Sequence, residues 1–485
     1  MSKYLSLLPC ILIFFGCANP IDDFKAGARS NVEHDTQLQK GTLGIALSGG
    51  GLRSSAFAFG ALKTLYDENV LTDVDIISTV SGGGYTGYEV FINEVCKPSN
   101  TCYQSSQFGE ATFGSNNFTE IAYAHYSTAN FVNFGDAWLS IFPFYTLVDV
   151  YNNQIRRKFG YSESESGIYI GNLNDVNDNF NTPELIVNTT FLDPRPDNFS
   201  QDIYEFSPTQ AGSDARGFND YTDTNGPLLS QLVAISGAAT KQLLKQTITD
   251  PTSFSNEDIT LSDGGHSDNL GAYSLIRRGV EKVIIIDAEH DPDYKFGAYY
   301  NLQDRLGYWG YSLYIEGIEQ YKNRKNRNLK TPYPFMRGKA LTPNGDKIEI
   351  VYLKAIKSDY VDCLYDQSMV GNGQVIRDKN RTLLNNNKDE NGKWQSNILA
   401  NEIIDYDALF ANHLETYPLL LETLWRVKLS NLFNSNDTKL DFPQYSTFDQ
   451  SFFNDQYFAF VALGYYSAKG LGSFIAQEDT RCGFE

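Results

Sequence analysis

Apolar runs and helical patterns alternate along the first part of the chain. The runs "LGIALSG" at 43–49 and "DVDIISTVSGGG" at 73–84 are rich in branched apolar residues and end at glycines. Each run is followed by a segment with apolar residues at helical spacing, at 54–70 and at 85–95. Strands that alternate with helices over short joins are typical of a parallel sheet covered on both faces. The pattern therefore predicts an α/β fold.

The same alternation returns after a long interruption. The segment "ELIVNTTFLD" predicts a strand at 184–193, and "LLSQLVAISGAATKQLL" predicts a helix at 228–244 with a Ser-Gly break. Residues 258–291 predict a strand, a glycine turn, a helix and a final strand. The stretch at about 97–180 is rich in Ser, Asn, Tyr and Phe, and we interpret it as an insertion.

The pattern divides the chain into a leader, a linker and one elaborated domain. Residues 1–17 have the layout of an export signal, and 18–40 form a polar linker. The remaining 41–485 contain no second clear linker, so we expect a single catalytic domain with a C-terminal extension from about 292, where the pattern becomes less regular.

The leader allows two kinds of processing. Its apolar run from Tyr4 to Phe15 is shorter than the roughly 20 residues that span a bilayer. The sequence "FFGC" resembles a bacterial lipoprotein box, which makes Cys17 a candidate for lipidation, and an ordinary signal-peptide cut nearby is the alternative. We expect an exported protein in either case. Four cysteines remain after the leader, and we favour a disulfide between Cys96 and Cys102, although other pairings are open.

The charge of the chain argues against nucleic acid as a partner. The formal net charge is -20 at pH 7, with 39 Lys and Arg against 59 Asp and Glu. A nucleic-acid surface needs basic groups to contact phosphates, and this composition leaves no broad basic surface.

Three glycine turns contain the candidate chemistry. In "SGGGLR", Gly49, Gly50 and Gly51 lie between a strand and a helix, where backbone N–H groups can bind an anion or an oxyanion. The loop lacks the Gly-Lys-Ser/Thr ending of a nucleotide phosphate loop, and its glycine spacing does not match a dinucleotide site. A tight structural turn is the alternative.

The second and third turns add a nucleophile and a base. Ser81 in "ISTVSGGGY" stands where a strand ends and a helix begins, as in a nucleophile elbow, although Thr79 replaces the usual first glycine. Asp263 ends a strand in "LSDGGHSDNLG", where it can accept the proton of a serine, and a turn or capping aspartate is the alternative. His266 lies beside this turn, but no histidine is set in a pattern that indicates a triad. The positions of Ser48, on a strand that would bury it, and of Ser78, with no glycines directly after it, favour structural roles for both.

In this order, the three turns resemble the patatin-like phospholipase family, and "SGGGLR" is similar to its cytosolic phospholipase A branch. The resemblance covers most of 42–465 and implies a three-layer α/β/α fold with a mainly parallel central sheet. It implies that Gly49 to Gly51 form an oxyanion hole, that Ser81 and Asp263 form a catalytic dyad, and that Arg53 contacts the phosphate or head group of the lipid.

The resemblance implies a serine lipid acyl hydrolase of the phospholipase A or lysophospholipase type. Its substrates would be membrane lipids, and the dyad needs neither a metal nor an organic cofactor. The alternatives are an acyltransferase, a neutral-lipid lipase, or a non-catalytic lipid-binding lipoprotein, which Thr79 favours. From the leader we expect an exported protein, either a membrane-anchored lipoprotein of the bacterial cell envelope or a secreted protein.

Overall fold

The computed structural model describes ten segments and several single positions of the chain. The segments are 42–94, 107–114, 167–174, 182–192, 202–223, 226–237, 246–253, 257–319, 334–356 and 454–472, and the single positions are 152, 155, 358, 443 and 444. Cys17, Cys96, Cys102, the linker and most of the expected insertion lie outside the described residues.

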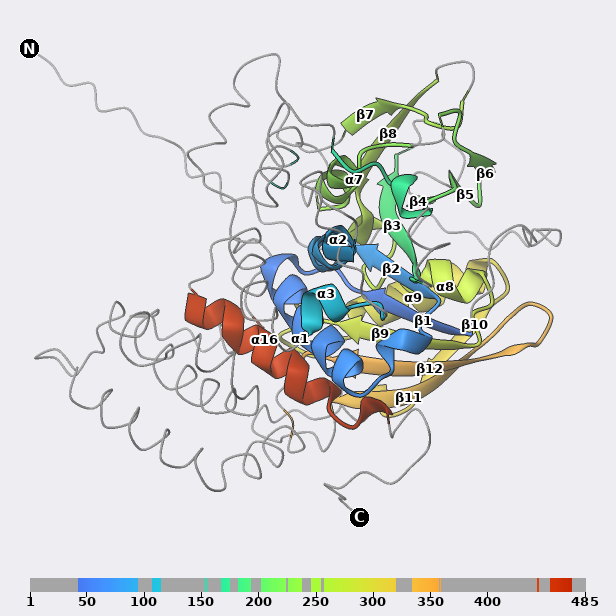
Figure 1. Cartoon of the computed structure of the whole chain (residues 1–485). Helices are drawn as coiled ribbons and strands as arrows, with labels where there is room; N and C mark the ends of the chain where they lie inside the picture. The colour runs from blue at the N-terminus through green and yellow to red at the C-terminus, as the bar shows by residue number, and fades with distance from the viewer. Residues whose placement is uncertain are drawn as a thin grey trace, which may run out of the picture.

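The described strands join into one sheet with a parallel centre (Figure 1). They are β1 (Leu43–Leu47), β2 (Ile76–Val80), β3 (Glu184–Phe191), β4 (Asp202–Phe206), β5 (Gln210–Ser213), β6 (Gly217–Asp220), β7 (Gln246–Thr249), β8 (Asp258–Asp263), β9 (Lys282–Asp287), β10 (Ser312–Ile315), β11 (Phe335–Leu341) and β12 (Lys347–Lys354). The order is β10-β11-β12-β9-β1-β2-β3-β4-β5-β6, and β8 pairs with β3 and β7. Neighbours from β12 to β3 run parallel, which confirms the predicted parallel centre.

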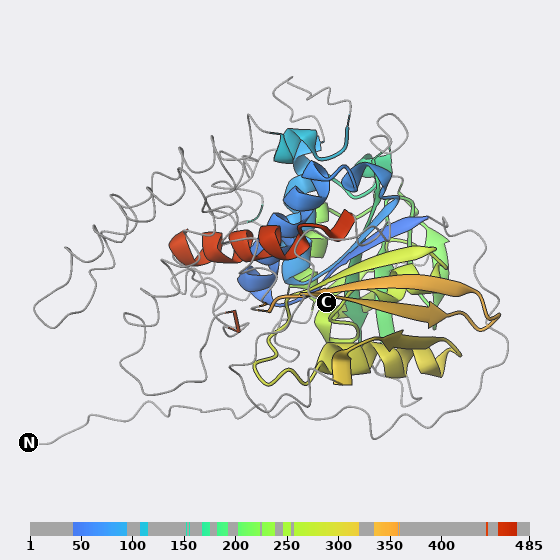
Figure 2. The same cartoon turned by 90° about the horizontal axis from the view of Figure 1, so that it is seen from below.

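Helices cover both faces of this sheet. The described α-helices are α1 (Gly51–Asp67), α2 (Gly82–Glu94), α3 (Glu110–Phe113), α7 (Leu229–Ser236), α8 (Tyr273–Arg277), α9 (Gly297–Tyr308) and α16 (Asn454–Ala468). In Figure 2, α1 and α16 lie on one side of the sheet and α9 lies on the other. Strand β1 serves both cores, because Ile45 and Leu47 pack on the side of α1 whereas Ala46 packs on the side of α8 and α9. The three-layer prediction is confirmed.

The region after Asp291 contains more regular structure than its pattern indicates. Helix α9 and the antiparallel strands β10 to β12 extend the sheet beyond β9. The pattern is weak because exposed edge strands carry polar residues. Along β10 the side chains of Ser312 and Tyr314 are exposed, and those of Leu313 and Ile315 are buried.

Helix α16 packs on α1 at two glycines. A Cβ atom placed on Gly60 would lie 1.9 Å from the carbonyl oxygen of Val461, and one on Gly464 would lie 2.0 Å from that of Phe57. The two backbones therefore touch where side chains would otherwise separate them. The hydroxyl of Thr64 also donates to the carbonyl oxygen of Tyr465 at 2.7 Å. Residues about four hundred positions apart thus fix the helix that begins at the first glycine turn.

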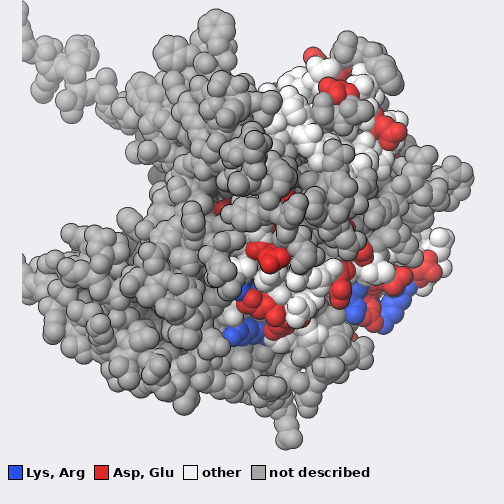
Figure 3. Space-filling model, in the orientation of Figure 1, with Lys and Arg blue, Asp and Glu red and all other residues white. Residues whose placement is uncertain are grey.

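None of the described helices has the length and the apolar character that a membrane crossing requires. On the face drawn in Figure 3, the described Lys and Arg side chains lie among Asp and Glu side chains.

We expect Gly464→Ala to destabilise the protein by about 1–3 kcal/mol, because the added methyl group overpacks the contact between α1 and α16. Gly307→Ala in α9 is the matched control, since a Cβ atom there meets nothing within 4 Å. The control should be neutral or stabilising by about 0.4–1 kcal/mol. Urea unfolding of both variants checks this, and equal midpoints would contradict the tight contact.

Candidate active site

Strand β3 brings the second and third glycine turns together. Strand β4 occupies one edge of β3, and β2 and β8 share the other edge from opposite directions. The pairing with parallel β2 ends at Val80 opposite Asn188, and antiparallel β8 ends at Asp263 opposite Thr189. Because Asn188 and Thr189 are neighbours on β3, the residues that follow β2 meet the end of β8.

Ser81 has the backbone of a nucleophile elbow. Its φ is +50°, a left-handed conformation that non-glycine residues seldom adopt and that is often found at functional sites. Its backbone N–H donates to the hydroxyl oxygen of Ser236 at 2.8 Å, and that hydroxyl donates to the carbonyl oxygen of Asn188 at 2.6 Å. The last turn of α7 thus holds the elbow against β3.

The side chains of Ser81 and Asp263 form a hydrogen-bonded pair. The Ser81 hydroxyl donates to Oδ2 of Asp263 at 3.1 Å, and the other carboxylate oxygen accepts from the N–H of Gly265 at 2.7 Å. Each residue is only 5% exposed. Burial raises the pKa of Asp263 to about 7, against the lowering effect of the hydrogen bonds from Gly265 and Ser81. A carboxylate with this pKa can take a proton from serine near neutral pH and return it.

Thr79 fits the elbow despite replacing a glycine. Its hydroxyl donates to the carbonyl oxygen of Ile186 at 3.1 Å. Its methyl group faces Gly87 in α2, where an added Cβ would lie 2.8 Å from Thr79 Cγ2. Because Gly87 has no side chain, the helix leaves room for the methyl group of Thr79, and the turn does not need a glycine at position 79.

The first glycine turn presents free backbone donors next to the elbow. Gly50 and Gly51 have φ values of +144° and +64°, which only glycine adopts readily. Within the described part of the chain, the N–H of Gly49 donates to the carbonyl oxygen of Asn269 at 2.8 Å, and no acceptor is found for the N–H groups of Gly50 and Gly51. These two donors lie at the N-terminus of α1, where the helix dipole favours negative charge.

Arg53 lies beneath the glycine loop rather than on its surface. It is 1% exposed, and its Nε donates to the carbonyl oxygen of Ala288 at 2.9 Å. Burial lowers its pKa to about 10, although the carboxylates of Asp287 and Glu289 act in the opposite direction. Lys354 neutralises the same two carboxylates, with Nζ at 2.7 Å from Asp287 and 3.0 Å from Glu289. The arginine therefore connects α1 to a buried ionic cluster at the end of β9.

The other polar residues near the turns have structural hydrogen bonds. Ser78 donates to the carbonyl oxygen of Gly271 at 2.6 Å, and Ser48 accepts from the N–H of Ala288 at 2.8 Å. The Nδ1 of His266 lies 3.2 Å from the hydroxyl of Ser262, whereas the Ser81 hydroxyl bonds to Asp263. The sequence patterns did not identify Ser236, because nothing local connects a helical serine to a turn 155 positions away.

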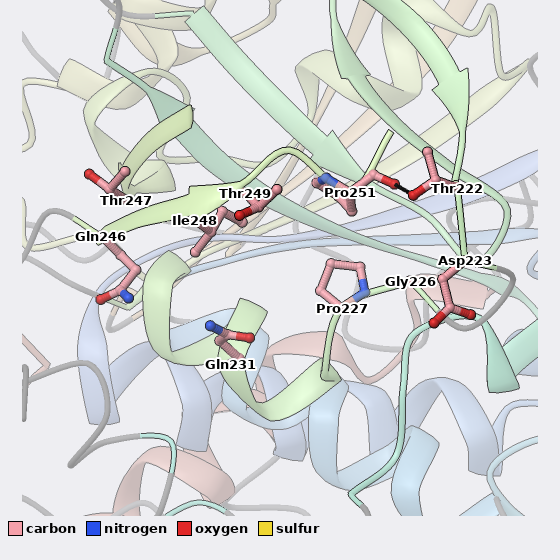
Figure 4. Close-up of a pocket in the computed structure, with 10 residues that line it drawn as sticks. All are labelled: Thr222, Asp223, Gly226, Pro227, Gln231, Gln246, Thr247, Ile248, Thr249 and Pro251. Carbon is pink, nitrogen blue, oxygen red and sulfur yellow. Dashed lines mark hydrogen bonds between the residues drawn. The ribbon is translucent and has the colours of Figure 1, made fainter. Parts of the chain in front are cut away.

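A separate pocket lies beside the first turn of α7, which contains Gln231, whereas Ser236 in the last turn contacts Ser81 (Figure 4). It has a volume of about 420 Å³ and is lined by Thr222, Asp223, Gly226, Pro227, Gln231, Gln246, Thr247, Ile248, Thr249 and Pro251. This lining contains none of the predicted site residues. Among the residues that the structure describes, no group of three or more His, Cys, Asp or Glu is placed to hold a metal ion.

Comparison with known proteins gives one family and a set of structural neighbours. Residues 45–276 match the family model described as Patatin-like phospholipase. The fold is similar to human GIVD cytosolic phospholipase A2, with a TM-score of 0.53 and 11% identity over 91% of this chain and 63% of that chain. The complex of that enzyme with methyl gamma-linolenyl fluorophosphonate gives 0.50 and 12% over 91% and 59%. This chain thus spans less than two thirds of these neighbours, and no curated protein matches it.

We expect Ser81 to react with an alkyl fluorophosphonate at a rate that rises with pH and levels off above a midpoint near 7. Asp263 must be deprotonated to accept the serine proton, and burial places its pKa at about 7. Asp263→Asn should react slowly and without this pH dependence. The labelling rate measured between pH 5 and 9 tests the prediction. A midpoint near 4, the ordinary value for aspartate, would contradict the raised pKa.

Proposed function

We propose that this chain, which belongs to the patatin-like phospholipases through residues 45–276, hydrolyses acyl esters of lipids. The reaction would pass through an acyl-enzyme on Ser81. The observation that supports this most strongly is the hydrogen bond of 3.1 Å from the Ser81 hydroxyl to Asp263, next to the free N–H groups of Gly50 and Gly51. These groups provide a nucleophile, a base and an oxyanion site.

The reaction begins with attack of Ser81 Oγ on the ester carbonyl carbon, while the serine proton moves to Oδ2 of Asp263. The carbonyl oxygen becomes negative and accepts hydrogen bonds from the N–H groups of Gly50 and Gly51. When the intermediate collapses, the bond to the alcohol breaks and Asp263 returns the proton to the leaving oxygen. The products of this step are the free alcohol and an ester of the acyl group with Ser81.

Water completes the cycle with the same groups. It attacks the acyl carbon and gives a proton to Asp263, and the second intermediate collapses to release the fatty acid. The proton then returns to Ser81 Oγ. Another alcohol in place of water would give acyl transfer, and this is the alternative reaction for the same site.

Product analysis on a mixed panel of phospholipids, lysophospholipids and neutral lipids tests this function. Wild-type protein should release free fatty acid from phospholipids or lysophospholipids, and Ser81→Ala should release none while it remains folded. Release only from triacylglycerol would favour the lipase, and a new ester formed with an added alcohol would favour the acyltransferase. Absence of any acyl product would contradict hydrolysis and favour a lipid-binding role.

Two roles for Arg53 lead to different substrate dependence. The family resemblance assigns it to the lipid phosphate, whereas its burial and its bond to Ala288 favour support of the glycine loop. We therefore expect Arg53→Ala to reduce hydrolysis of a phospholipid and of a short uncharged ester alike, by about 1.5–3 kcal/mol in activation free energy. A loss confined to the phospholipid would instead establish the phosphate contact.

We further propose that the protein is exported and tethered to a membrane by lipid on Cys17. A net charge of -20 would repel the protein from anionic bilayers, so a tether would supply what electrostatic attraction does not. Wild-type protein from a bacterial host should partition into the detergent phase, and Cys17→Ser should remain in the aqueous phase. Equal partitioning of the two proteins would contradict the lipid anchor.

A further inference from the structure

The residue Asn269 lies between the glycine loop and the turn that carries the base. It follows β8 and the short 3-10 helix Gly264–His266, six positions after Asp263. Its carbonyl oxygen accepts the N–H of Gly49 at 2.8 Å, so its backbone is joined to the glycine loop. The side chain is partly exposed, unlike those of its neighbours Asp268 and Leu270, which are buried.

The amide group of Asn269 fills the space beside two glycines of the site. A Cβ atom placed on Gly49 would lie 2.1 Å from Asn269 Oδ1 and 3.3 Å from Ser81 Cβ. A Cβ atom placed on Gly265 would lie 2.7 Å from the same Asn269 oxygen and 2.9 Å from Oδ1 of Asp263. The amide is therefore adjacent to both members of the Ser81 and Asp263 pair.

The side chains of Asp268 and Asn269 differ in their hydrogen bonding. Asp268 next to it binds the N–H groups of Leu270 and Tyr273 at 3.0 and 2.9 Å, as a turn residue does. In contrast, the Asn269 side chain has no hydrogen-bond partner among the described residues. The atom nearest to both glycines is Oδ1, but no hydrogen bond from a described residue fixes which end of the amide faces the site, so a half-turn of the amide presents its two N–H donors there.

The position of Asn269 indicates which substrate atom it meets. The carbonyl oxygen of the ester already has donors in Gly50 and Gly51. The leaving oxygen must lie close to Asp263, because Asp263 returns the proton to it. The Asn269 amide lies between Gly49 and Gly265, and the N–H of Gly265 holds the Asp263 carboxylate, so the amide can reach an oxygen atom that lies close to Asp263.

We infer that the Asn269 amide donates a hydrogen bond to the leaving alcohol oxygen of the ester and so acts as a further catalytic residue. The inference rests on the proposed ester hydrolysis. A donor at this oxygen stabilises the negative charge that develops as the bond to the alcohol breaks, before the proton arrives. The benefit therefore depends on how basic the leaving alcohol is.

Asn269→Ala should lower kcat/KM for an alkyl or glycerol ester by about tenfold or more, but for a p-nitrophenyl ester of the same acid by less than about threefold. The nitrophenolate already spreads its negative charge, so it gains little from the amide. The acyl-enzyme should be hydrolysed at the same rate whichever ester formed it, because both substrates give the same acyl group. The alanine variant retains the backbone bond to Gly49.

Asn269→Leu provides a second variant of similar size that lacks the donor and adds no charge, and it should show the same dependence on leaving group. Asn219→Ala, at an exposed position on β6, is the control and should leave both rates unchanged. Equal losses on the two esters would overturn the inference while leaving the hydrolase intact. A wild-type protein that cleaves neither ester would overturn the proposed function and this role with it.

Discussion

The hydrogen bonding of β3 to two strands on one edge is the constraint on which the candidate site depends. Asn188 supports it in three ways. Its backbone pairs with Val80, its carbonyl oxygen accepts from Ser236, and its side-chain amide donates to the hydroxyl of Ser78 at 2.8 Å. At Thr189, one residue later, the strand that pairs with this edge of β3 changes from β2 to β8, and β8 ends at Asp263. A serine and an aspartate 182 positions apart are thus placed within 3.1 Å by neighbouring residues of one strand.

Burial makes Asp263 a stronger base than an aspartate in water. An aspartate in water has a pKa near 3.9 and is a weak base for a serine hydroxyl. Removing Asp263 from water raises its pKa to about 7, and only one backbone N–H and the serine itself are left to stabilise its charge. Arg53 lies beneath the glycine loop and bonds to Ala288, and α16 packs on α1, the helix that follows the loop. These contacts fix the start of α1, where the N–H groups of Gly50 and Gly51 are the proposed oxyanion donors.

The sequence allowed much of this to be predicted, because local patterns identify local structures. The β1 and β2 runs, the glycine turns and the elbow at Ser81 each have a short signature, and Asp263 follows from its place at the end of an apolar strand. The contacts that assemble the site are not local. The capping of Ser81 by Ser236, the packing of Gly464 on α1 and the amide of Asn269 depend on residues that meet only after folding. The burial of Arg53 was also not predictable, because its acceptor is the backbone of Ala288, 235 positions later.

If the acyl group passes through Ser81, as proposed, the acyl-enzyme can be trapped during turnover. Wild-type protein is mixed with a lipid ester whose acyl chain carries an isotope label, quenched in acid during turnover and digested for mass spectrometry. We expect the labelled acyl group on the peptide that contains Ser81, with a label that disappears as free fatty acid forms. Acyl product formed at the full rate with no label on this peptide, or with the label on another residue, would contradict the account.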